Sequence, residues 1–256
     1  MGALQGKTIF ITGASSGIGK ACAEAFAKEG SHLILAARRA DRLLYISKDL
    51  ANRYGVKTKS YQLDVRNQAE VKKTVSSFLD DFKTIDILIN NAGLAKGYNK
   101  IYEGNILHWE EMIDTNVKGL LYVTREILPL MIENGSGHVI NIGSTAGHDV
   151  YQNGNVYCAT KFAVNALTQS IRIDVLDKNI KVSTVDPGMV ETEFSLVRYS
   201  GDNEKAKNTY KGVKPLTAED VASAVLFCAS QPEHVNINEI IITPSIQASS
   251  NHIFRK

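Results

Sequence analysis

At the N-terminal end of the chain a strand, a glycine-rich turn and a helix follow one another without interruption. Residues 7–12 are expected to form a buried strand, and the following helix ends at Gly30. The glycines between them, Gly13-x-x-x-Gly17-x-Gly19, let the backbone come close to a pyrophosphate, while the helix N-terminus offers N–H groups and partial positive charge. The spacing differs from the general G-x-G-x-x-G pattern and could form only a tight turn, but its place after the first strand favours nucleotide binding. The expected binding loop comprises Gly13, Ser15, Gly17, Ile18 and Gly19.

Strands and helices alternate along the rest of the chain in a way that predicts a parallel sheet. Further strands are expected at residues 32–37, 58–65, 85–93, 138–144 and 181–188, with helices between them. This alternation is typical of a doubly wound parallel sheet flanked by helices on both faces. No repeat, proline-rich linker or low-complexity segment interrupts it, and 256 residues suit one α/β domain. We therefore expect a single-domain, Rossmann-type α/β fold over residues 1–256.

Two arginines follow the second expected strand. A site that prefers NAD usually carries an acidic residue about 20 residues past the glycines, where it holds the ribose 2′-hydroxyl. This chain has Arg38 and Arg39 at that place. A guanidinium there suits the 2′-phosphate of NADP by charge and by bidentate hydrogen bonding. The alternative is two solvated arginines at the start of a helix, but the substitution favours NADP(H) as the cofactor.

A serine, a tyrosine and a lysine are spaced so that they could act on one carbonyl group. Ser144 ends a β-branched run at the carboxyl edge of the predicted sheet, where open α/β sheets bind ligands. Tyr157 and Lys161 are four residues apart on the next expected helix and so share a face. A phenol has a pKa of about 10, and a nearby ammonium can lower it, so that Tyr157 exchanges a proton with a substrate oxygen to which Ser144 donates. Taken alone, Tyr157 and Lys161 could also be an amphipathic pair on a half-buried helix.

Asparagines stand at two further places. Asn90, Asn91 and Gly93 end the fourth expected strand at the same edge, where they could bind a ligand or simply form a turn. Asn116 stands among apolar residues within a helix expected at residues 109–132. A polar side chain buried there needs partners, and a structural hydrogen bond is the default interpretation.

Composition limits the partners of the protein. The net charge is +2 and no basic cluster is longer than Arg38-Arg39, so nucleic acid and membrane are not expected partners. Cys22, Cys158 and Cys228 are odd in number, widely separated and without a zinc-ligand spacing. They favour reduced thiols, and we expect a cytoplasmic protein that uses no metal. No apolar run reaches the roughly 18 residues that a membrane span needs.

Taken in order, these features resemble the short-chain dehydrogenase/reductase family over essentially the whole chain. The matching motifs are Thr12-Gly13-x-x-x-Gly17-x-Gly19, Asn90-Asn91-Ala92-Gly93, Asn116, Ser144, Tyr157-x-x-x-Lys161 and Pro187-Gly188. The resemblance implies that Tyr157 is the catalytic acid/base, that Ser144 holds the substrate oxygen, and that Lys161 binds the nicotinamide ribose and lowers the pKa of Tyr157. It also implies that Asn116 helps to hold a proton-relaying water and that the protein is a homotetramer. The remaining implied cofactor contacts are Asp64, Val65, Asn91, Pro187, Gly188 and Val190.

The C-terminal third is similar to a narrower group, the NADP-dependent 3-hydroxy acid dehydrogenases, and to its fungal members in the segment VETEFSLVRY and the ending HIFR. This implies reversible hydride transfer between NADP and the carbon that bears the 3-hydroxyl of serine, allo-threonine, 3-hydroxyisobutyrate or related acids. Residues 189–215 are long and polar enough to form a lid over the substrate. Arg198 within them could bind the substrate carboxylate, although an exposed lid arginine more often faces water.

Two other functions stay open at this point. One is a broad-specificity NADPH-dependent reductase of aldehydes, ketones or diketones, because loops set the substrate within the family. The other is an NADP-binding sensor or scaffold without turnover, which would be expected to have lost Tyr157 or Lys161. The final segment, residues 247–256, could pack across subunits or fray as chain ends usually do.

Overall fold

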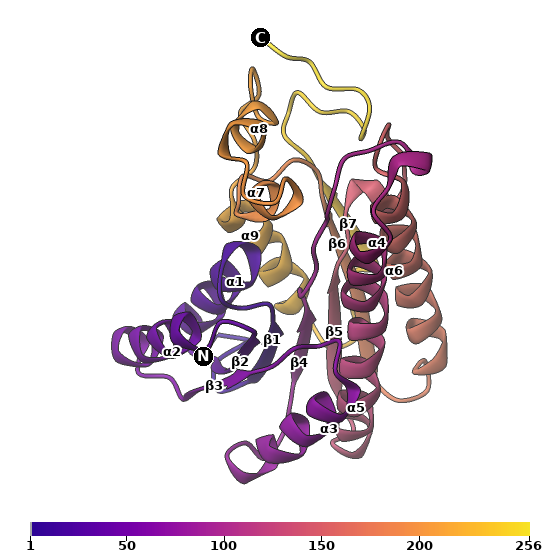
Figure 1. Ribbon diagram of the computed structural model, residues 1–256. Coiled ribbons are helices and arrows are strands. Elements are labelled where there is room, and N and C mark those ends of the chain that lie inside the picture. The colour runs from indigo at the N-terminus through magenta and orange to yellow at the C-terminus, as the bar shows by residue number, and fades with distance from the viewer. Residues whose placement is uncertain (1) are drawn as a thin grey trace.

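The computed structural model describes residues 2–256, and all seven of its strands lie in one parallel sheet (Figure 1). The strand order is β3-β2-β1-β4-β5-β6-β7. The strands are β1 (Thr8–Thr12), β2 (His32–Ala37), β3 (Thr58–Gln62), β4 (Ile87–Asn90), β5 (Gly137–Ile142), β6 (Ile180–Pro187) and β7 (Glu239–Ile242). The predicted Rossmann-type, doubly wound sheet is confirmed.

Helices cover both faces of this sheet. One layer consists of α1 (Gly17–Lys28), α2 (Ala40–Tyr54) and α9 (Ala218–Ala229). The opposite layer consists of α3 (Gln68–Ser76), α5 (Leu120–Glu133) and α6 (Asn155–Asp174). Side chains alternate along β1, so Ile9 and Ile11 face the first layer while Phe10 faces the second, and all three are fully buried. The central strands β1, β2 and β4 are almost entirely buried because both faces of the sheet are covered there, whereas the edge strands β3 and β7 are partly exposed. Within residues 2–256, no helix is both long enough and apolar enough to span a membrane.

The strand order reverses at β1, and this reversal places the ligand site. β1 pairs with β2 on one side and with β4 on the other. The chain leaving β1 enters α1, in one helical layer, whereas the chain leaving β4 passes through α4 (Ile106–Ile113) to α5, in the other layer. Connections that diverge in this way leave a crevice at the carboxyl ends of the strands, where open α/β sheets bind their ligands.

Several element boundaries differ from the sequence prediction, and two of the differences lie beside the cleft. The third strand ends at Gln62 because its only neighbour, β2, ends opposite it at Ala37. The helix expected at residues 109–132 is interrupted by a π-helical turn, Asp114–Gly119, between α4 and α5. The turn carries Asn116, and π-helical insertions of this kind are common at functional sites.

Residues 189–215 form a helical excursion beside the cleft. It contains α7 (Phe194–Arg198) and α8 (Asn203–Asn208), at the end of the molecule where the C-terminal segment also lies (Figure 1). Its base is closed by backbone hydrogen bonds, from Glu191 N to Leu216 O at 2.9 Å and from Leu216 N to Met189 O at 2.9 Å. We refer to residues 189–215 as the lid, and their closing over a substrate stays a prediction.

The C-terminal segment, residues 247–256, packs on its own chain. Arg255 Nη1 donates to the carbonyl oxygen of Lys211 at 2.7 Å, within the lid. On the other side Asn251 Nδ2 donates to the carbonyl oxygen of Val150 at 2.7 Å, in the loop between β5 and α6. These contacts hold the segment within the subunit in place of fraying, and packing across subunits stays a prediction.

Candidate active site

A cleft opens at the carboxyl edge of the sheet, with an empty volume of about 1510 Å³ including its open mouth. Most residues that the sequence assigned to cofactor binding line it: Gly13, Ser15, Gly17, Ile18, Arg38, Arg39, Asp64, Val65, Asn91, Tyr157, Lys161, Pro187, Gly188 and Val190. Ser144 lines it as well, whereas Gly19, Asn116 and Arg198 lie behind or beside its walls. The fold thus brings residues from nearly the whole chain to one site.

The glycine loop leaves room for a ligand because it has no side chains at its tightest points. A Cβ on Gly13 would lie 2.8 Å from the side-chain nitrogen of Asn91, and a Cβ on Gly19 would lie even closer to the same atom. Gly13 also has a φ of +66°, which residues with side chains rarely adopt. No acidic residue occupies the first turn of α1, so the positive end of its dipole can face an anion. The loop fits a pyrophosphate, and Gly19 contributes through close packing.

Asn91 ties the ends of β4 and β1 together. Its Nδ2 donates to the carbonyl oxygens of Thr12 at 2.9 Å and Gly13 at 3.2 Å, while its backbone N–H donates to the Thr12 hydroxyl at 3.1 Å. Asn90 points into the core instead, where its Nδ2 donates to Asn141 Oδ1 at 2.9 Å. Of the two adjacent amides, only Asn91 shapes the cleft.

The two arginines after β2 differ in orientation. Arg39 turns toward the glycine loop, where its Nη2 donates to the Ser16 hydroxyl at 2.6 Å and its Nε donates to the Ser15 hydroxyl at 3.1 Å. Arg38 turns outward, with 55% of its side chain exposed and Nη1 3.6 Å from a carboxylate oxygen of Glu111. Both form a cationic rim that suits a phosphate group, and Arg39 is the one held in place.

A carboxylate from the lid reaches the same cationic rim. Glu193 places one oxygen 2.7 Å from Arg39 Nη1 and the other 2.7 Å from Arg42 Nη1. Hydrogen bonds from these arginines lower the pKa of Glu193, so it stays ionised at neutral pH. The sequence analysis missed Glu193 and Arg42, because a charged residue in a polar segment carries no pattern that marks it.

Asp64 and Val65 reach the cleft from the end of β3. The Asp64 carboxylate accepts hydrogen bonds from Arg66 Nη2 at 2.5 Å and Arg66 Nε at 2.9 Å, and these lower the pKa of Asp64. Val65 packs against the π-helical turn, where a Cβ on Gly119 would lie 2.6 Å from Val65 Cγ2. The wall thus offers a hydrogen-bond acceptor next to an apolar surface, which suits a nucleobase.

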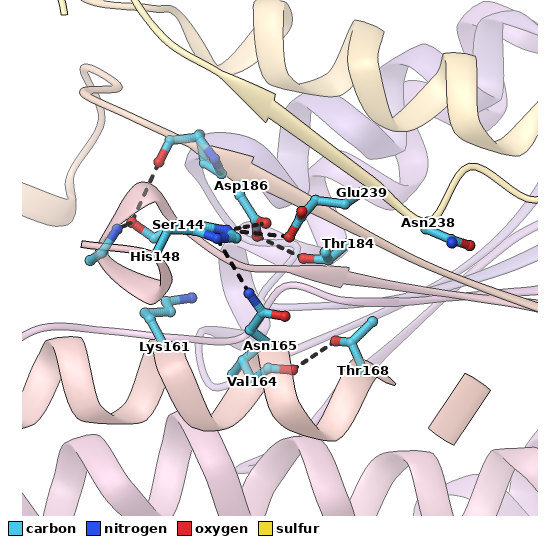
Figure 2. A network of polar contacts seen from close by, with 12 residues as sticks. Ser144, His148, Lys161, Val164, Asn165, Thr168, Thr184, Asp186, Asn238 and Glu239 are labelled. Atoms are coloured by element: carbon cyan, nitrogen blue, oxygen red, sulfur yellow. Dashed lines mark hydrogen bonds and ion pairs between the residues drawn. The ribbon is translucent and has the colours of Figure 1, made fainter. Parts of the chain in front are cut away.

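Ser144 lies where β5 gives way to a short 3-10 turn, Thr145–Gly147 (Figure 2). Its hydroxyl accepts from the Ala146 N–H at 3.1 Å and donates to the carbonyl oxygen of Pro187 at 3.4 Å. A bond of that length is weak, so the Ser144 hydroxyl can redirect its hydrogen bond to another acceptor in the cleft at little cost.

Tyr157 and Lys161 lie on α6 with their polar ends buried at the cleft. Lys161 Nζ donates to the carbonyl oxygen of Ile142 at 2.8 Å and lies 6.0 Å from the centre of the Tyr157 ring. Burial lowers the pKa of Lys161 to about 8. Burial also raises the pKa of Tyr157, opposed by the charge of Arg198 and by a hydrogen bond with Ser144.

The pKa of Tyr157 as a whole is raised, because burial outweighs the neighbouring charges. That Lys161 acts to lower this pKa stays a prediction. Lys161 Nζ is engaged with Ile142 O. The cation that most opposes the effect of burial on Tyr157 is Arg198.

Asn116 holds the connection after β4 against α6. Its Oδ1 accepts from Leu94 N at 2.8 Å, and its Nδ2 donates to Leu94 O at 2.8 Å and to the Thr160 hydroxyl at 3.0 Å. The side-chain amide is therefore occupied, as the default structural interpretation requires. Its part in holding a water near Lys161 stays a prediction.

Arg198 is surrounded by aromatic rings and does not simply face water. Its guanidinium carbon lies 5.0 Å from the ring centre of Tyr157, 5.3 Å from that of Phe194 and 5.6 Å from that of Tyr151. Its Nη2 donates to the Tyr151 hydroxyl at 2.5 Å, while its Nε is buried and has no hydrogen-bond partner within residues 2–256. Among residues 2–256, Arg198 thus has a buried donor without an acceptor next to Tyr157, although buried N–H groups are usually paired.

Tyr151 and Phe194 are functional candidates that the sequence analysis missed. The Phe194 ring lies 5.5 Å from that of Tyr157, centre to centre, and both Phe194 and Tyr151 flank Arg198. The sequence marks these two residues only weakly, because each is simply a large aromatic residue within a polar segment.

Known proteins are similar to the chain over most or all of its length. A family model described as short chain dehydrogenase matches residues 7–202. An NADP-dependent 3-hydroxy acid dehydrogenase of Schizosaccharomyces pombe is 45% identical, with 100% of this chain and 99% of that protein covered. A serine 3-dehydrogenase of Rhizobium radiobacter is 43% identical, with 94% and 95% covered. The closed form of a serine dehydrogenase complexed with NADP+ matches with a TM-score of 0.90 and 41% identity, covering 97% of this chain and 99% of that one. Since the site, the fold and these relatives agree, the chain belongs to the short-chain dehydrogenase family of oxidoreductases.

Proposed function

We propose that the protein is an NADP-dependent oxidoreductase that transfers hydride at the 3-hydroxyl of small 3-hydroxy acids such as serine, allo-threonine or 3-hydroxyisobutyrate. The observation that carries the substrate class is Arg198, whose buried Nε lies beside the phenol of Tyr157 and has no partner within residues 2–256. A carboxylate can accept two parallel hydrogen bonds from a guanidinium, whereas an uncharged ketone has no group of that kind. The names of the similar proteins, 3-hydroxy acid dehydrogenase and serine 3-dehydrogenase, support the same class.

The cleft suits NADP(H) as the cofactor. The glycine loop and the N-terminus of α1 would hold the pyrophosphate, and Arg39 with Arg38 would bind the 2′-phosphate. Asp64 and Val65 would lie along the adenine, and Asn91 near the adenosine ribose. The NADP+ in the similar serine dehydrogenase supports this assignment. When bound, the cofactor supplies the hydride acceptor or donor.

The side chains at the centre of the cleft would handle the proton. In oxidation Tyr157, as a phenolate, would remove the proton of the 3-hydroxyl; in reduction its phenol would return one to the carbonyl oxygen. Ser144 would donate a hydrogen bond to the same oxygen while charge develops on it. Lys161 would bind the nicotinamide ribose and, while protonated, favour the phenolate. Asn116 would help to hold a water that relays protons to Lys161.

We also propose that the protein assembles as a homotetramer. Apolar side chains are exposed on α4, α5, α6 and just beyond: Ile106, Leu107, Leu121, Phe162, Ile173 and Leu176. Ile173 is 73% exposed and Leu176 is 82% exposed, so burying them against another copy would remove apolar surface from water. Light scattering that returns the mass of one subunit would contradict the assembly.

A cytoplasmic location is part of the same proposal. Cys22, Cys158 and Cys228 are all buried as free thiols, with no disulfide between them. Free thiols of this kind persist in a reducing compartment.

The experiment that tests the function follows absorbance at the reduced-nicotinamide band. The oxidation arm supplies NADP+ or NAD+ with L-serine, L-allo-threonine, 3-hydroxyisobutyrate or 3-hydroxybutyrate, and the reduction arm supplies NADPH with apolar ketones. NADP-linked oxidation of the hydroxy acids supports the proposal. Reduction of ketones alone would replace it by the carbonyl reductase function, and NADP+ binding without turnover would replace it by the sensor function.

Tyr157→Phe tests the assignment of the acid/base. The variant keeps the ring that packs against Phe194 but lacks the hydroxyl. Turnover should fall by about 10²- to 10⁴-fold while the dissociation constant for NADP+ stays the same. A variant with full turnover would remove Tyr157 from this role.

A further inference from the structure

A buried polar cluster lies directly behind the catalytic residues (Figure 2). At its centre is Asp186, near the end of β6, which is only 2% exposed. Asp186 and Thr184 are two residues apart and so share the face of the sheet that α6 covers, together with Val182. The Thr184 hydroxyl donates to Asp186 Oδ1 at 2.7 Å, and His148 Nε2 lies 2.8 Å from Asp186 Oδ2. Both carboxylate oxygens are therefore held, as a buried charge requires.

Asp186 and Lys161 approach adjacent residues at the end of β5. Lys161 Nζ donates to the carbonyl oxygen of Ile142 at 2.8 Å. The next residue, Gly143, can carry no side chain, because a Cβ there would overlap Asp186 Oδ1. The carboxylate and the ammonium thus lie against neighbouring residues, in an interior where opposite charges interact more strongly than in water.

His148 links the same carboxylate to the turn that carries Ser144. Ser144 and His148 flank the 3-10 turn Thr145–Gly147. With its Nε2–H donated to Asp186, His148 can accept at Nδ1 from the Asn165 amide at 3.4 Å. The residue after Asp186 is Pro187, whose carbonyl oxygen accepts from the Ser144 hydroxyl at 3.4 Å. One end of β6 therefore holds both ends of this turn.

We propose that Asp186 is a positioning residue for the reaction described above, and the inference rests on that proposed function. Its carboxylate keeps the ammonium of Lys161 protonated and, through His148, fixes the turn that presents Ser144. None of these contacts places Asp186 against the substrate itself.

The charge of Asp186 acts on the pKa values of Lys161 and Tyr157 in the same direction. Burial lowers the pKa of Lys161 to about 8, and the negative charge of Asp186 acts against that lowering. The same charge acts to raise the pKa of Tyr157. Removing it therefore moves both groups in one direction: the ammonium loses its proton more readily, and so does the phenol.

Three other titratable groups face the cluster, namely Glu239, Arg172 and His148. From β7, Glu239 lies 3.3 Å from His148 Nε2, and its pKa is raised by burial and by a hydrogen bond with Asp186. From α6, Arg172 acts against that rise, as does His148 from the turn. The hydrogen bond between the two carboxyl groups therefore favours the protonated form of Glu239.

Asp186→Asn tests the inference, since it keeps the size of the side chain and removes its charge. The first readout needs no turnover: competitive labelling of lysine amines with a small acylating reagent across pH, read by peptide mass spectrometry, gives the pKa of Lys161. We expect that pKa to fall by about one unit, with exposed Lys72 unchanged as the internal reference. Asp186→Ala, the second variant without the charge, should show the same shift.

The second readout is the pH profile of kcat/KM. Both limbs should move to lower pH by about one unit in Asp186→Asn. The matched control is Asp86→Asn, which removes a carboxylate that pairs with Lys7 before β4 begins, at the opposite end of the sheet, and should move neither readout. A lower rate with unmoved limbs and an unchanged pKa of Lys161 would reduce Asp186 to a structural role and overturn the inference. An absence of turnover in the parent protein would instead count against the proposed function, while the labelling of Lys161 still decides this inference.

Discussion

Glu193 of the lid and Arg39 beyond β2 face each other across the mouth of the cleft, with Oε2 and Nη1 2.7 Å apart. Arg39 is also the arginine that contacts Ser15 and Ser16 in the glycine loop. A carboxylate therefore sits on the guanidinium that we assign to the 2′-phosphate of NADP, and the two anions compete for it.

Removing this carboxylate should strengthen NADP+ binding. We expect the dissociation constant for NADP+ to fall by about two- to fivefold in Glu193→Gln, the range of an exposed ion pair, while that for NAD+ stays the same. Calorimetric titration measures both constants, and Glu191→Gln on the same segment is the matched control because Glu191 is exposed and forms no ion pair within residues 2–256. Weaker binding of both cofactors would show that Glu193 mainly stabilises the closed lid.

The two neighbouring arginines should differ in their effect on cofactor choice. Arg39→Ala should weaken NADP+ binding by about 10- to 100-fold, because a held, charged hydrogen-bond donor is lost. Arg38→Ala should have a smaller effect, since the Arg38 side chain is 55% exposed and turned toward Glu111. Affinity for NAD+ serves as the control in both variants. The reverse order, with Arg38 dominant, would mean that Arg38 reorients when the cofactor binds.

Arg198 should matter for acids and not for neutral substrates. In Arg198→Met, kcat/KM for serine or 3-hydroxyisobutyrate should fall by about 10- to 100-fold, mainly through KM, because the carboxylate loses a charged donor. Reduction of an uncharged ketone should change far less. Tyr151→Phe is the companion variant: it removes the hydroxyl that accepts from Arg198 Nη2 and leaves the charge in place. Equal losses on acids and ketones would reassign Arg198 to holding the aromatic residues around Tyr157.

The buried imidazole of His138 should make stability depend on pH. His138 is 3% exposed, and burial lowers its pKa from 6.5 to about 3. Below about pH 6.5 the unfolded chain binds a proton at this histidine that the folded protein does not bind. The free energy of unfolding therefore decreases as the pH is lowered from about 6.5 to about 3. From pH 7 to pH 5 the loss from this group is about 2 kcal/mol, measurable by urea denaturation. His138→Gln should flatten that dependence, and an unchanged slope would assign it to other groups.

The parts of the site that could be predicted are those that the topology brings together. Asn91, Ser144 and Tyr157 follow strands, or begin the helix after a strand, and parallel strands end at one edge. The alternation of strands and helices was readable because each apolar run is buried on both faces. The spacing of two residues within one helix, such as Tyr157 and Lys161, could be read from the sequence equally well.

The surroundings of Arg198 and Asp186 could not be predicted in the same way. Arg198 meets Tyr151 only because the lid folds back over the loop between β5 and α6, and no periodic pattern encodes that approach. The burial of Tyr157, which raises its pKa, could not be predicted either. Contacts between irregular segments and degrees of burial are properties of the assembled fold.

The C-terminal segment, residues 247–256, is hydrogen-bonded both to the lid and to the β5–α6 loop. Arg255 is hydrogen-bonded to the lid at Lys211, and Asn251 to the β5–α6 loop at Val150. When this segment detaches, both walls lose an anchor at the same moment, so the lid and the loop form one cooperative unit of local unfolding. Amide hydrogen exchange in the two segments should then rise and fall together, and the cleft would open from both sides in a single event.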